Sequence, residues 1–392
     1  MFAFLISVIP FLVWLTLFFT RGFFWLEEPQ AFSEKQSAAS PEVAVIVPAR
    51  NEAEVIEQSL ASLFAQDYPG AYRIFLVDDH SNDGTADRAR AAAQKAGQEK
   101  RLSIISAPPL PAGWGGKLWA MQSGVAAAAK EMPGARYYLF TDADIAHSAT
   151  SLRELVTRAE EGNLTLASFM VRLHCRSFAE KLLIPAFVFF FMMLYPFAWV
   201  RDVKNPTAAA AGGAMLVKRA ALDEMQGFTE MKNAIIDDCT LANRLKAKGP
   251  IWLGLAKDTV SLRRYPKIED IWNMVARTAY AQLNYSPLQL AVCVLGMALV
   301  FVGPLAALFC VGFPVALGFV TWLLMSFIYM PMLRFYGVFP FYGFALPFIA
   351  LIYLLATLDS ARRHAFGCGG EWKGRVHRRS DRIKTEAQSE PS

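Results

Sequence analysis

The sequence predicts an α/β protein in which a mostly parallel, Rossmann-like sheet domain is flanked by transmembrane helices at both ends of the chain. In the charged middle region, short apolar runs rich in β-branched and aromatic residues alternate with segments of helical periodicity. That order requires parallel strands joined by crossover helices. The chain is also 54% hydrophobic, more than is usual for a soluble protein. The excess lies in two nearly uncharged stretches, residues 1–20 and about 288–358, which predict membrane helices.

The charge pattern divides the chain into five segments. We expect an N-terminal transmembrane anchor over residues 1–21, a polar linker over 22–41, the sheet domain over 42–285, transmembrane segments over 286–359 and a basic tail over 360–392. The first segment has no charged start and no small-residue cleavage site. An uncleaved anchor is therefore favoured over a signal peptide.

Charge and cysteine content exclude several functional classes. The net charge of +5 is modest, and the basic residues gather in the tail without interleaved aromatic residues. Contact with solvent or anionic lipid fits this composition better than nucleic-acid binding. The five cysteines show no close pairing in the sequence. Neither a disulfide framework nor a zinc site is indicated, and a reducing compartment is favoured.

Besides a short strand at residues 215–217, four strands are predicted, at residues 43–47, 74–77, 104–105 and 137–140. Each is followed by a loop, and the first three loops lead into segments of helical pattern. In such sheets ligands bind outside the C-terminal ends of the strands, so the acids at the ends of the second and fourth strands should share one site. These acids are Asp78, Asp79, Asp142 and Asp144.

The triplet Asp142-Ala143-Asp144 is the motif around which the others are arranged. Its carboxylates follow a buried strand at a point where the chain turns, so both can reach one ligand. Their hard oxygen atoms suit Mg²⁺ or Mn²⁺, which bind one or two carboxylates together with the phosphates of a substrate. A solvated turn or a set of helix caps is the simpler alternative, but capping does not explain four acids at two strand ends.

Two glycine-containing motifs allow close approach of a ligand. Lys117 follows the glycine-rich loop 113–116 at the start of a helix, where a phosphate can come near the backbone and the lysine supplies a positive charge. Gly212 and Gly213 precede a short strand and would let the backbone pass beside a ligand.

A pair of acids and a long apolar segment complete the sheet domain. Asp237 and Asp238 open a short helix, either as helix caps or with one of them acting as a general base. Residues 182–200 are rich in Phe and Met and nearly long enough to span a bilayer. Spanning would place the flanking residues on opposite sides of the membrane. An interfacial or re-entrant helix is therefore favoured, with a buried core helix as the alternative.

Together these motifs resemble those of glycosyltransferase family 2, the inverting enzymes with the GT-A fold. The motifs lie in family order over about residues 43–285, and jointly they are a specific signal although each alone is weak. They are Pro48-Ala49-Arg50-Asn51-Glu52, Val77-Asp78-Asp79-His80-Ser81-Asn82-Asp83-Gly84-Thr85, Gly116-Lys117, Asp142-Ala143-Asp144, Gly212-Gly213 and Asp237-Asp238.

The resemblance implies a role for each motif. The first two would bind the nucleoside, and Lys117 would lie near the nucleotide or its phosphates. Asp142 and Asp144 would hold the diphosphate through Mg²⁺ or Mn²⁺, with Asp144 as the more direct metal ligand. Asp238 matches the general base, with Asp237 in support. The residues implied in substrate binding are Pro48, Ala49, Arg50, Asn51, Glu52, Asp78, Asp79, Lys117, Asp142, Gly212, Gly213, Gln282 and Tyr285.

Other features narrow the resemblance to membrane-bound lipid glycosyltransferases near the ceramide glucosyltransferases, closest to the group associated with bacterial hopanoid synthesis. They are the apolar flanks, the run Trp114-Gly115-Gly116-Lys117 and the run Glu371-Trp372-Lys373-Gly374-Arg375. Processive relatives carry Gln-x-x-Arg-Trp after the base, which Gln282 and Tyr285 echo only loosely. Transfer of a single sugar, from a UDP-sugar to a membrane lipid, is therefore expected. A polyprenyl phosphate or a sphingolipid-like acceptor stays open.

The expected membrane topology follows from where the substrate is found. Nucleotide sugars are cytosolic, so the sheet domain should face the cytoplasm at a bacterial inner membrane. Three C-terminal crossings would place the basic tail outside, against the positive-inside tendency, so one segment is re-entrant or the tail is an exception.

Two other functions are alternatives to sugar transfer. A nucleotidyltransferase would have no use for Asp237 and Asp238 beside a membrane helix. An inactive lipid-binding protein would tolerate loss of the acids that this chain carries.

Overall fold

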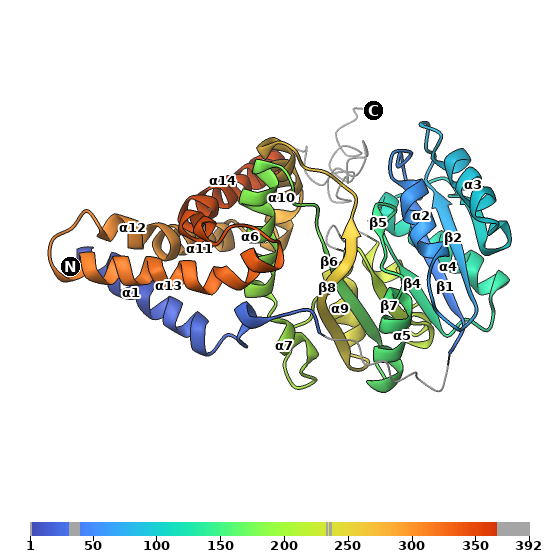
Figure 1. The fold of residues 1–392 in the computed structure, drawn as a ribbon, viewed down its shortest axis with the longest axis horizontal. Coiled ribbons are helices and arrows are strands. Elements are labelled where there is room, and N and C mark those ends of the chain that lie inside the picture. The colour runs from blue at the N-terminus through green and yellow to red at the C-terminus, as the bar shows by residue number, and fades with distance from the viewer. Residues whose placement is uncertain (1, 31–39, 233, 235–236, 367–392) are drawn as a thin grey trace, which may run out of the picture. The chain divides into compact units, whose positions relative to one another are not determined.

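A computed structural model of the chain describes residues 2–30, 40–232, 234 and 237–366, which pack into two compact units (Figure 1). The sheet unit contains the described residues of 29–173 and 200–263, and the helical unit contains those of 2–28, 174–199 and 264–366. Part of the predicted linker, most of the basic tail and the run from Glu371 to Arg375 lie outside the described residues.

The sheet has eight strands in the order β3-β2-β1-β4-β7-β6-β8-β5. The first four strands predicted from sequence, β1 to β4, pair in parallel, as expected, and the short strand predicted at residues 215–217 is β7. Beyond them the sheet is mixed: β7 is antiparallel to both β4 and β6, β6 is parallel to β8, and β5 is antiparallel to β8. The strands are β1 (Val43–Ala49), β2 (Tyr72–Asp78), β3 (Leu102–Ser106), β4 (Tyr137–Phe140), β5 (Ile145–Ala146), β6 (Leu166–Arg172), β7 (Met215–Lys218) and β8 (Ile251–Ser261).

Helices cover both faces of this sheet. On one face, alternate β1 residues such as Val45 pack with Ile56 and Leu60 of α2 in a core that also includes α3 and α5. On the other face α4 lies close to β1 and β2: a Cβ atom at Gly124 would come within 2.5 Å of Ile46 and 3.0 Å of Val77. The helices of this unit are α2 (Ile56–Phe64), α3 (Thr85–Ala96), η2 (Glu99–Arg101), α4 (Gly116–Glu131), α5 (Ser151–Glu161), α8 (Arg219–Asp223), η3 (Thr229–Met231) and α9 (Asp237–Lys246). Helix α7 (Phe197–Arg201) begins in the helical unit and ends in the sheet unit.

The helical unit contains three stretches that are long and apolar enough to cross a membrane, Pro287–Ala307, Phe313–Phe335 and Pro340–Ala365. Large apolar side chains such as Leu295 and Phe327 remain exposed on them, as expected for lipid-facing positions. The N-terminal helix α1 is apolar but shorter. The elements are α1 (Phe2–Phe19), η1 (Phe24–Leu26), α6 (Phe178–Leu194), α10 (Ile268–Gln282), α11 (Pro287–Met297), η4 (Ala298–Val302), α12 (Gly303–Ala307), α13 (Phe313–Phe335), η5 (Pro340–Ala345) and α14 (Leu346–Ala365).

The apolar segment 182–200 forms most of α6. Side chains along this helix, among them Leu183, Ile184 and Phe189, are buried, and the helix contacts α10, α13 and α14. This burial is consistent with the alternative, a buried core helix. Phe178, at the N-terminal end of α6, is exposed and available for contact with a membrane. An interfacial role for α6 stays a prediction. The compact units also divide the chain at residues 173, 199 and 263, whereas the sequence pattern predicts one continuous domain over 42–285.

Candidate active site at the C-terminal edge of the sheet

The strand directions bring the predicted motifs to one edge of the sheet. β1, β2 and β4 are parallel, so the segments after Ala49, Asp78 and Phe140 leave at the same edge. β7 runs the opposite way and therefore begins there, directly after Gly212 and Gly213. Two antiparallel pairings restore the original direction in β6 and β8, so the C-terminal end of β8 lies at that edge too. This is the edge where α/β sheets bind ligands.

The loops after β1 and β2 are held together by side chains that accept hydrogen bonds from backbone amides. Asn51 has a left-handed φ of 52°, which asparagine tolerates better than most residues. Burial would raise the pKa of Asp83, but hydrogen bonds from Thr85 and the Ala53 amide lower it, which keeps this anchor ionised. The bonds, with the amide donor first, are Asn51 to Ser81 at 3.0 Å, Glu52 to Thr85 at 2.9 Å and Ala53 to Asp83 at 2.9 Å.

The two acids at the end of β2 have different surroundings. Asp79 is 1% exposed, and its Oδ2 lies 3.6 Å from Nη1 of Arg50, which also donates to the Asp79 carbonyl at 2.6 Å. Its amide donates to the carbonyl of Ala49, which with Pro48 ends β1. Asp78 is half-buried. Asp79 therefore stabilises the loop that follows β1, and Asp78 has the more accessible carboxylate.

Lys117 joins two of the predicted acidic motifs. It is the second residue of α4, and its Nζ lies 2.8 Å from Oδ1 of Asp142 and 3.5 Å from Oδ2 of Asp237. Burial alone would lower the pKa of Lys117, but the Asp142 and Asp237 carboxylates raise it above its ordinary value. The lysine is therefore a permanent cation between the end of β4 and the start of α9.

Asp238 lies beside this cluster with both oxygens bound to backbone amides. Its Oδ2 accepts from the amide of Gly212 at 3.0 Å, and its Oδ1 accepts from its neighbour Cys239 at 2.7 Å. Burial and the Asp237 carboxylate together raise the pKa of Asp238 to about 6, although the Lys117 ammonium and the two amide hydrogen bonds oppose the rise. A carboxylate with a raised pKa can accept a proton near neutral pH, as a general base requires.

The two predicted glycines have different packing. A Cβ atom at Gly212 would lie 3.2 Å from Nζ of Lys117 and 3.6 Å from Oδ2 of Asp238, so Gly212 keeps the space between these groups open. A Cβ atom at Gly213 would lie 2.8 Å from Val171, so this glycine allows the backbone to pack against β6. Gly212 belongs to the site, and Gly213 supports it through packing.

Asp144 is paired with an arginine that sequence analysis missed. Nε of Arg263 donates to Oδ2 of Asp144 at 2.8 Å, and its Nη2 donates to Oε1 of Glu52 at 3.0 Å. The Asp144 side chain is 9% exposed and that of Glu52 is 13% exposed. Arg263 follows β8 at the functional edge of the sheet. The apolar run that starts at Ile251 could have identified β8 as a strand. Arg263 would then have been expected near the other site residues at the C-terminal edge of the sheet.

The donor set at Asp142 and Asp144 suits Mg²⁺ or Mn²⁺. The two carboxylates supply hard oxygen ligands, and the described residues contain no group of three or more His, Cys, Asp or Glu side chains placed to hold a metal. Such ions are commonly held by one or two carboxylates, with water and phosphate oxygens completing the coordination. The residues therefore fit an ion that binds together with a diphosphate.

Gln282 is the last residue of α10 and Tyr285 follows it in a turn, both in the helical unit. The side-chain amide of Gln282 donates to the hydroxyl of Tyr195, and the ring of Tyr285 stacks on His364 with 4.4 Å between centroids. Both side chains thus have partners among the neighbouring helices. Their role in substrate binding stays a prediction.

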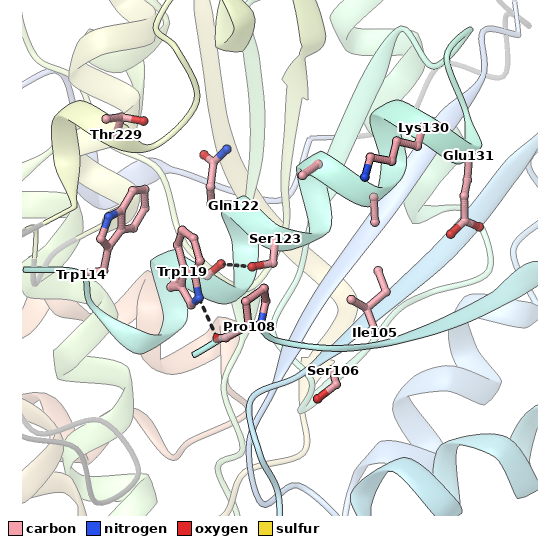
Figure 2. A pocket seen from close by; sticks show the side chains of 12 residues that line it. Ile105, Ser106, Pro108, Trp114, Trp119, Gln122, Ser123, Lys130, Glu131 and Thr229 are labelled. Atoms are coloured by element: carbon pink, nitrogen blue, oxygen red, sulfur yellow. Dashed lines mark hydrogen bonds between the residues drawn. The ribbon is translucent and has the colours of Figure 1, made fainter. Parts of the chain in front are cut away.

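A hollow of about 520 Å³ lies on the flank of α4. Figure 2 shows Trp114 and Trp119 on one side of it and Lys130 and Glu131 on the other. The two indole rings meet edge to face, with 5.1 Å between centroids. Lys117 does not line this hollow, which is therefore distinct from the cluster of lysine and acids.

The family match covers most of the sheet unit. Residues 44–226, from β1 to the end of the segment after α8, match the family described as "Glycosyl transferase family 2". The chain contains a glycosyl transferase family 2 domain. The fold and the enzyme class predicted from sequence are thereby confirmed at this level. The residues that match the family include Lys117, Asp142 and Gly212, but the match ends before Asp237 and Asp238. The assignment of Asp238 as the general base of the glycosyltransferase therefore stays a prediction.

Several solved structures are similar to this chain, and the first described here shows the same fold. The mannosyltransferase PcManGT from Pyrobaculum calidifontis, in complex with GDP-Man and Mn²⁺, is 20% identical with a TM-score of 0.58, covering 91% of this chain and 96% of its own. M. tuberculosis glucosyl-3-phosphoglycerate synthase is 19% identical with a TM-score of 0.41, covering 66% of this chain and 86% of its own. S. aureus TarS (residues 1–349) is 14% identical with a TM-score of 0.39, covering 83% and 92%. No curated protein sequence matches the glycosyltransferase.

Proposed function

We propose that this glycosyltransferase transfers a single sugar, with inversion, from a UDP-sugar to the hydroxyl group of a membrane lipid, with a divalent metal ion as cofactor. One observation carries the proposal. Lys117, Asp142, Asp237, Asp238 and Gly212 come from four separate segments and meet at the ligand-binding edge of the sheet. Helix capping alone would not bring a cation and three carboxylates together.

The residues of the cluster have separate tasks in this reaction. Asp238 takes the proton from the acceptor hydroxyl as that oxygen attacks the anomeric carbon. The new glycosidic C–O bond forms while the bond from the sugar to the diphosphate breaks, so the configuration inverts. Lys117 offsets the negative charge of the surrounding carboxylates and of a nearby phosphate. Gly212 leaves room for the reacting groups and orients Asp238 through its amide.

A metal ion would be held by Asp144 and Asp142. When bound, the ion offsets negative charge on the departing diphosphate. The complex of PcManGT with GDP-Man and Mn²⁺ supports a nucleotide sugar and a divalent ion in this fold. The loops built on Pro48, Ala49 and Asp78 would bind the nucleoside.

The acceptor is argued from the rest of the chain. Three described helices are long and apolar enough to cross a membrane, and a protein so anchored works where lipid acceptors are abundant. A polycyclic lipid of the hopanoid type in a bacterial inner membrane, with the sheet unit facing the cytoplasm, is the acceptor we favour. The loose match at Gln282 and Tyr285 to the motif of processive relatives supports transfer of one sugar.

The decisive experiment is transfer by the purified full chain. Radiolabelled UDP-sugars, with GDP-mannose as a second donor class, are incubated with the protein, Mn²⁺ and a lipid extract of its host. Label that moves into the organic phase, and does not move with the Asp238→Asn variant, supports the proposal. Label found only in water-soluble sugar products would refute a lipid acceptor. Release of a sugar 1-phosphate in place of a nucleoside diphosphate would indicate a nucleotidyltransferase.

A further inference from the structure

Arg263 connects three strand ends at the functional edge. It follows β8, and its guanidinium bonds Asp144 after β4 and Glu52 after β1, at 2.8 Å and 3.0 Å. The neighbouring backbone is fixed as well, because the amide of Leu262 donates to the carbonyl of Asp144 at 2.7 Å. The arginine side chain is 36% exposed, so one side of it is open to solvent while the other covers two nearly buried acids.

This arrangement conflicts with simultaneous binding of a metal ion at the same oxygen atom. Nε of Arg263 already donates a hydrogen bond to Oδ2 of Asp144. A divalent ion on that oxygen would be repelled by the adjacent positive charge of the guanidinium. Repulsion between the two cations would weaken binding of the metal ion at Asp144 while Arg263 stays in place. The incoming nucleotide changes this balance, since its diphosphate brings negative charge to the same place.

We propose that Arg263 is the counter-ion of Asp144 in the ligand-free protein and a contact of the donor diphosphate in the loaded protein. The inference rests on the proposed function. A guanidinium fork that has released a carboxylate can bind phosphate oxygens with the same paired geometry. The exchange makes metal binding depend on the nucleotide: Mn²⁺ alone competes with Arg263, whereas Mn²⁺ with a diphosphate leaves the arginine a new partner.

The test compares two affinities that should change in opposite directions. Binding of Mn²⁺ alone is followed by loss of the free-ion electron paramagnetic resonance signal, and binding of UDP in saturating Mn²⁺ is followed by calorimetry. In Arg263→Gln the competitor is gone, so Mn²⁺ alone should bind roughly threefold tighter or more. UDP with Mn²⁺ should bind roughly tenfold to a hundredfold more weakly, because a charged hydrogen-bond donor is lost.

Two further variants serve as controls for the role of Arg263. Arg263→Lys keeps the charge but loses the fork, so its Mn²⁺ affinity should stay near that of the wild type while UDP binding weakens. Arg264→Gln removes the same charge from the adjacent, exposed arginine and should leave both affinities unchanged. Equal UDP affinity in wild type and Arg263→Gln, or weaker binding of Mn²⁺ alone in that variant, overturns the role of Arg263. If the wild-type protein binds UDP neither with nor without Mn²⁺, the proposed function itself is refuted.

Discussion

Lys117 and Asp142 form an ion pair of 2.8 Å between Nζ and Oδ1, although one residue starts helix α4 and the other follows strand β4. Asp237 lies 3.5 Å from the same ammonium. The pairing matters for chemistry because Asp238, the proposed base, is the next residue along α9. Burial raises the pKa of Asp238, the Asp237 carboxylate adds to the rise and the Lys117 ammonium opposes it.

Asp238→Asn separates a base from a helix cap. Asparagine has nearly the same shape and caps helices as well as aspartate, but it cannot accept the proton. Sugar transfer to lipid should fall by about a hundredfold to ten-thousandfold, while UDP-sugar binding survives. The measurement is the rate of labelled lipid formation beside calorimetric binding of the donor. Unchanged transfer would show that Asp238 only caps α9.

The pH dependence of transfer should report the raised pKa of Asp238. The carboxylate is active when deprotonated, so kcat/KM should rise with pH through about 6 and level off above it. Burial and Asp237 cause the shift, and both persist in the free enzyme to which kcat/KM refers. A profile that levels off near pH 4, the ordinary range for aspartate, would contradict the assignment.

Lys117→Met should move that profile to higher pH. The ammonium opposes the rise in the pKa of Asp238, so its removal should raise this pKa further and move the rise of kcat/KM upward. Lys117→Arg keeps the charge and serves as the matched control, with its profile near that of the wild type. A loss of rate without any movement of the profile in Lys117→Met would show that the lysine does not influence Asp238.

Gly212→Ala and Gly213→Ala should have different effects although the residues are adjacent. At Gly212 a methyl group enters the space beside Lys117 and Asp238, so transfer should fall with little change in thermal stability. At Gly213 it meets Val171 at 2.8 Å, and overpacking of this kind costs about 1 to 3 kcal/mol of stability. Melting curves and transfer rates of the two variants, measured in the same detergent, test the contrast. Equal effects on both quantities would refute it.

Asp144→Ala tests metal dependence. If Asp144 holds the divalent ion, the variant should lose the part of UDP affinity that depends on Mn²⁺, and a chelator should have the same effect on the wild type. Calorimetry with and without the metal measures both. Metal-independent UDP binding of equal strength in the two proteins would exclude a metal at Asp144.

The sequence by itself determined the parallel half of the sheet and predicted most of the residues that lie at its C-terminal edge. The strands that end at Ala49, Asp78 and Phe140 are short apolar runs followed by polar loops, and parallel pairing brings their ends to one edge. The three C-terminal membrane-length helices were equally visible, because about 20 apolar residues in succession are a local property of the chain.

Only the tertiary structure decided which of these side chains meet. The pairing of Lys117 with Asp142 and Asp237, and the different packing of Gly212 and Gly213, depend on contacts between segments far apart in sequence. Arg263 was missed because Lys257 and Asp258 interrupt the apolar run of β8, which hides the continuation of the strand. Its position at the functional edge follows from two successive antiparallel pairings. Periodicity in one sequence records which face of an element is apolar, whereas the order and direction of strands come from packing between them.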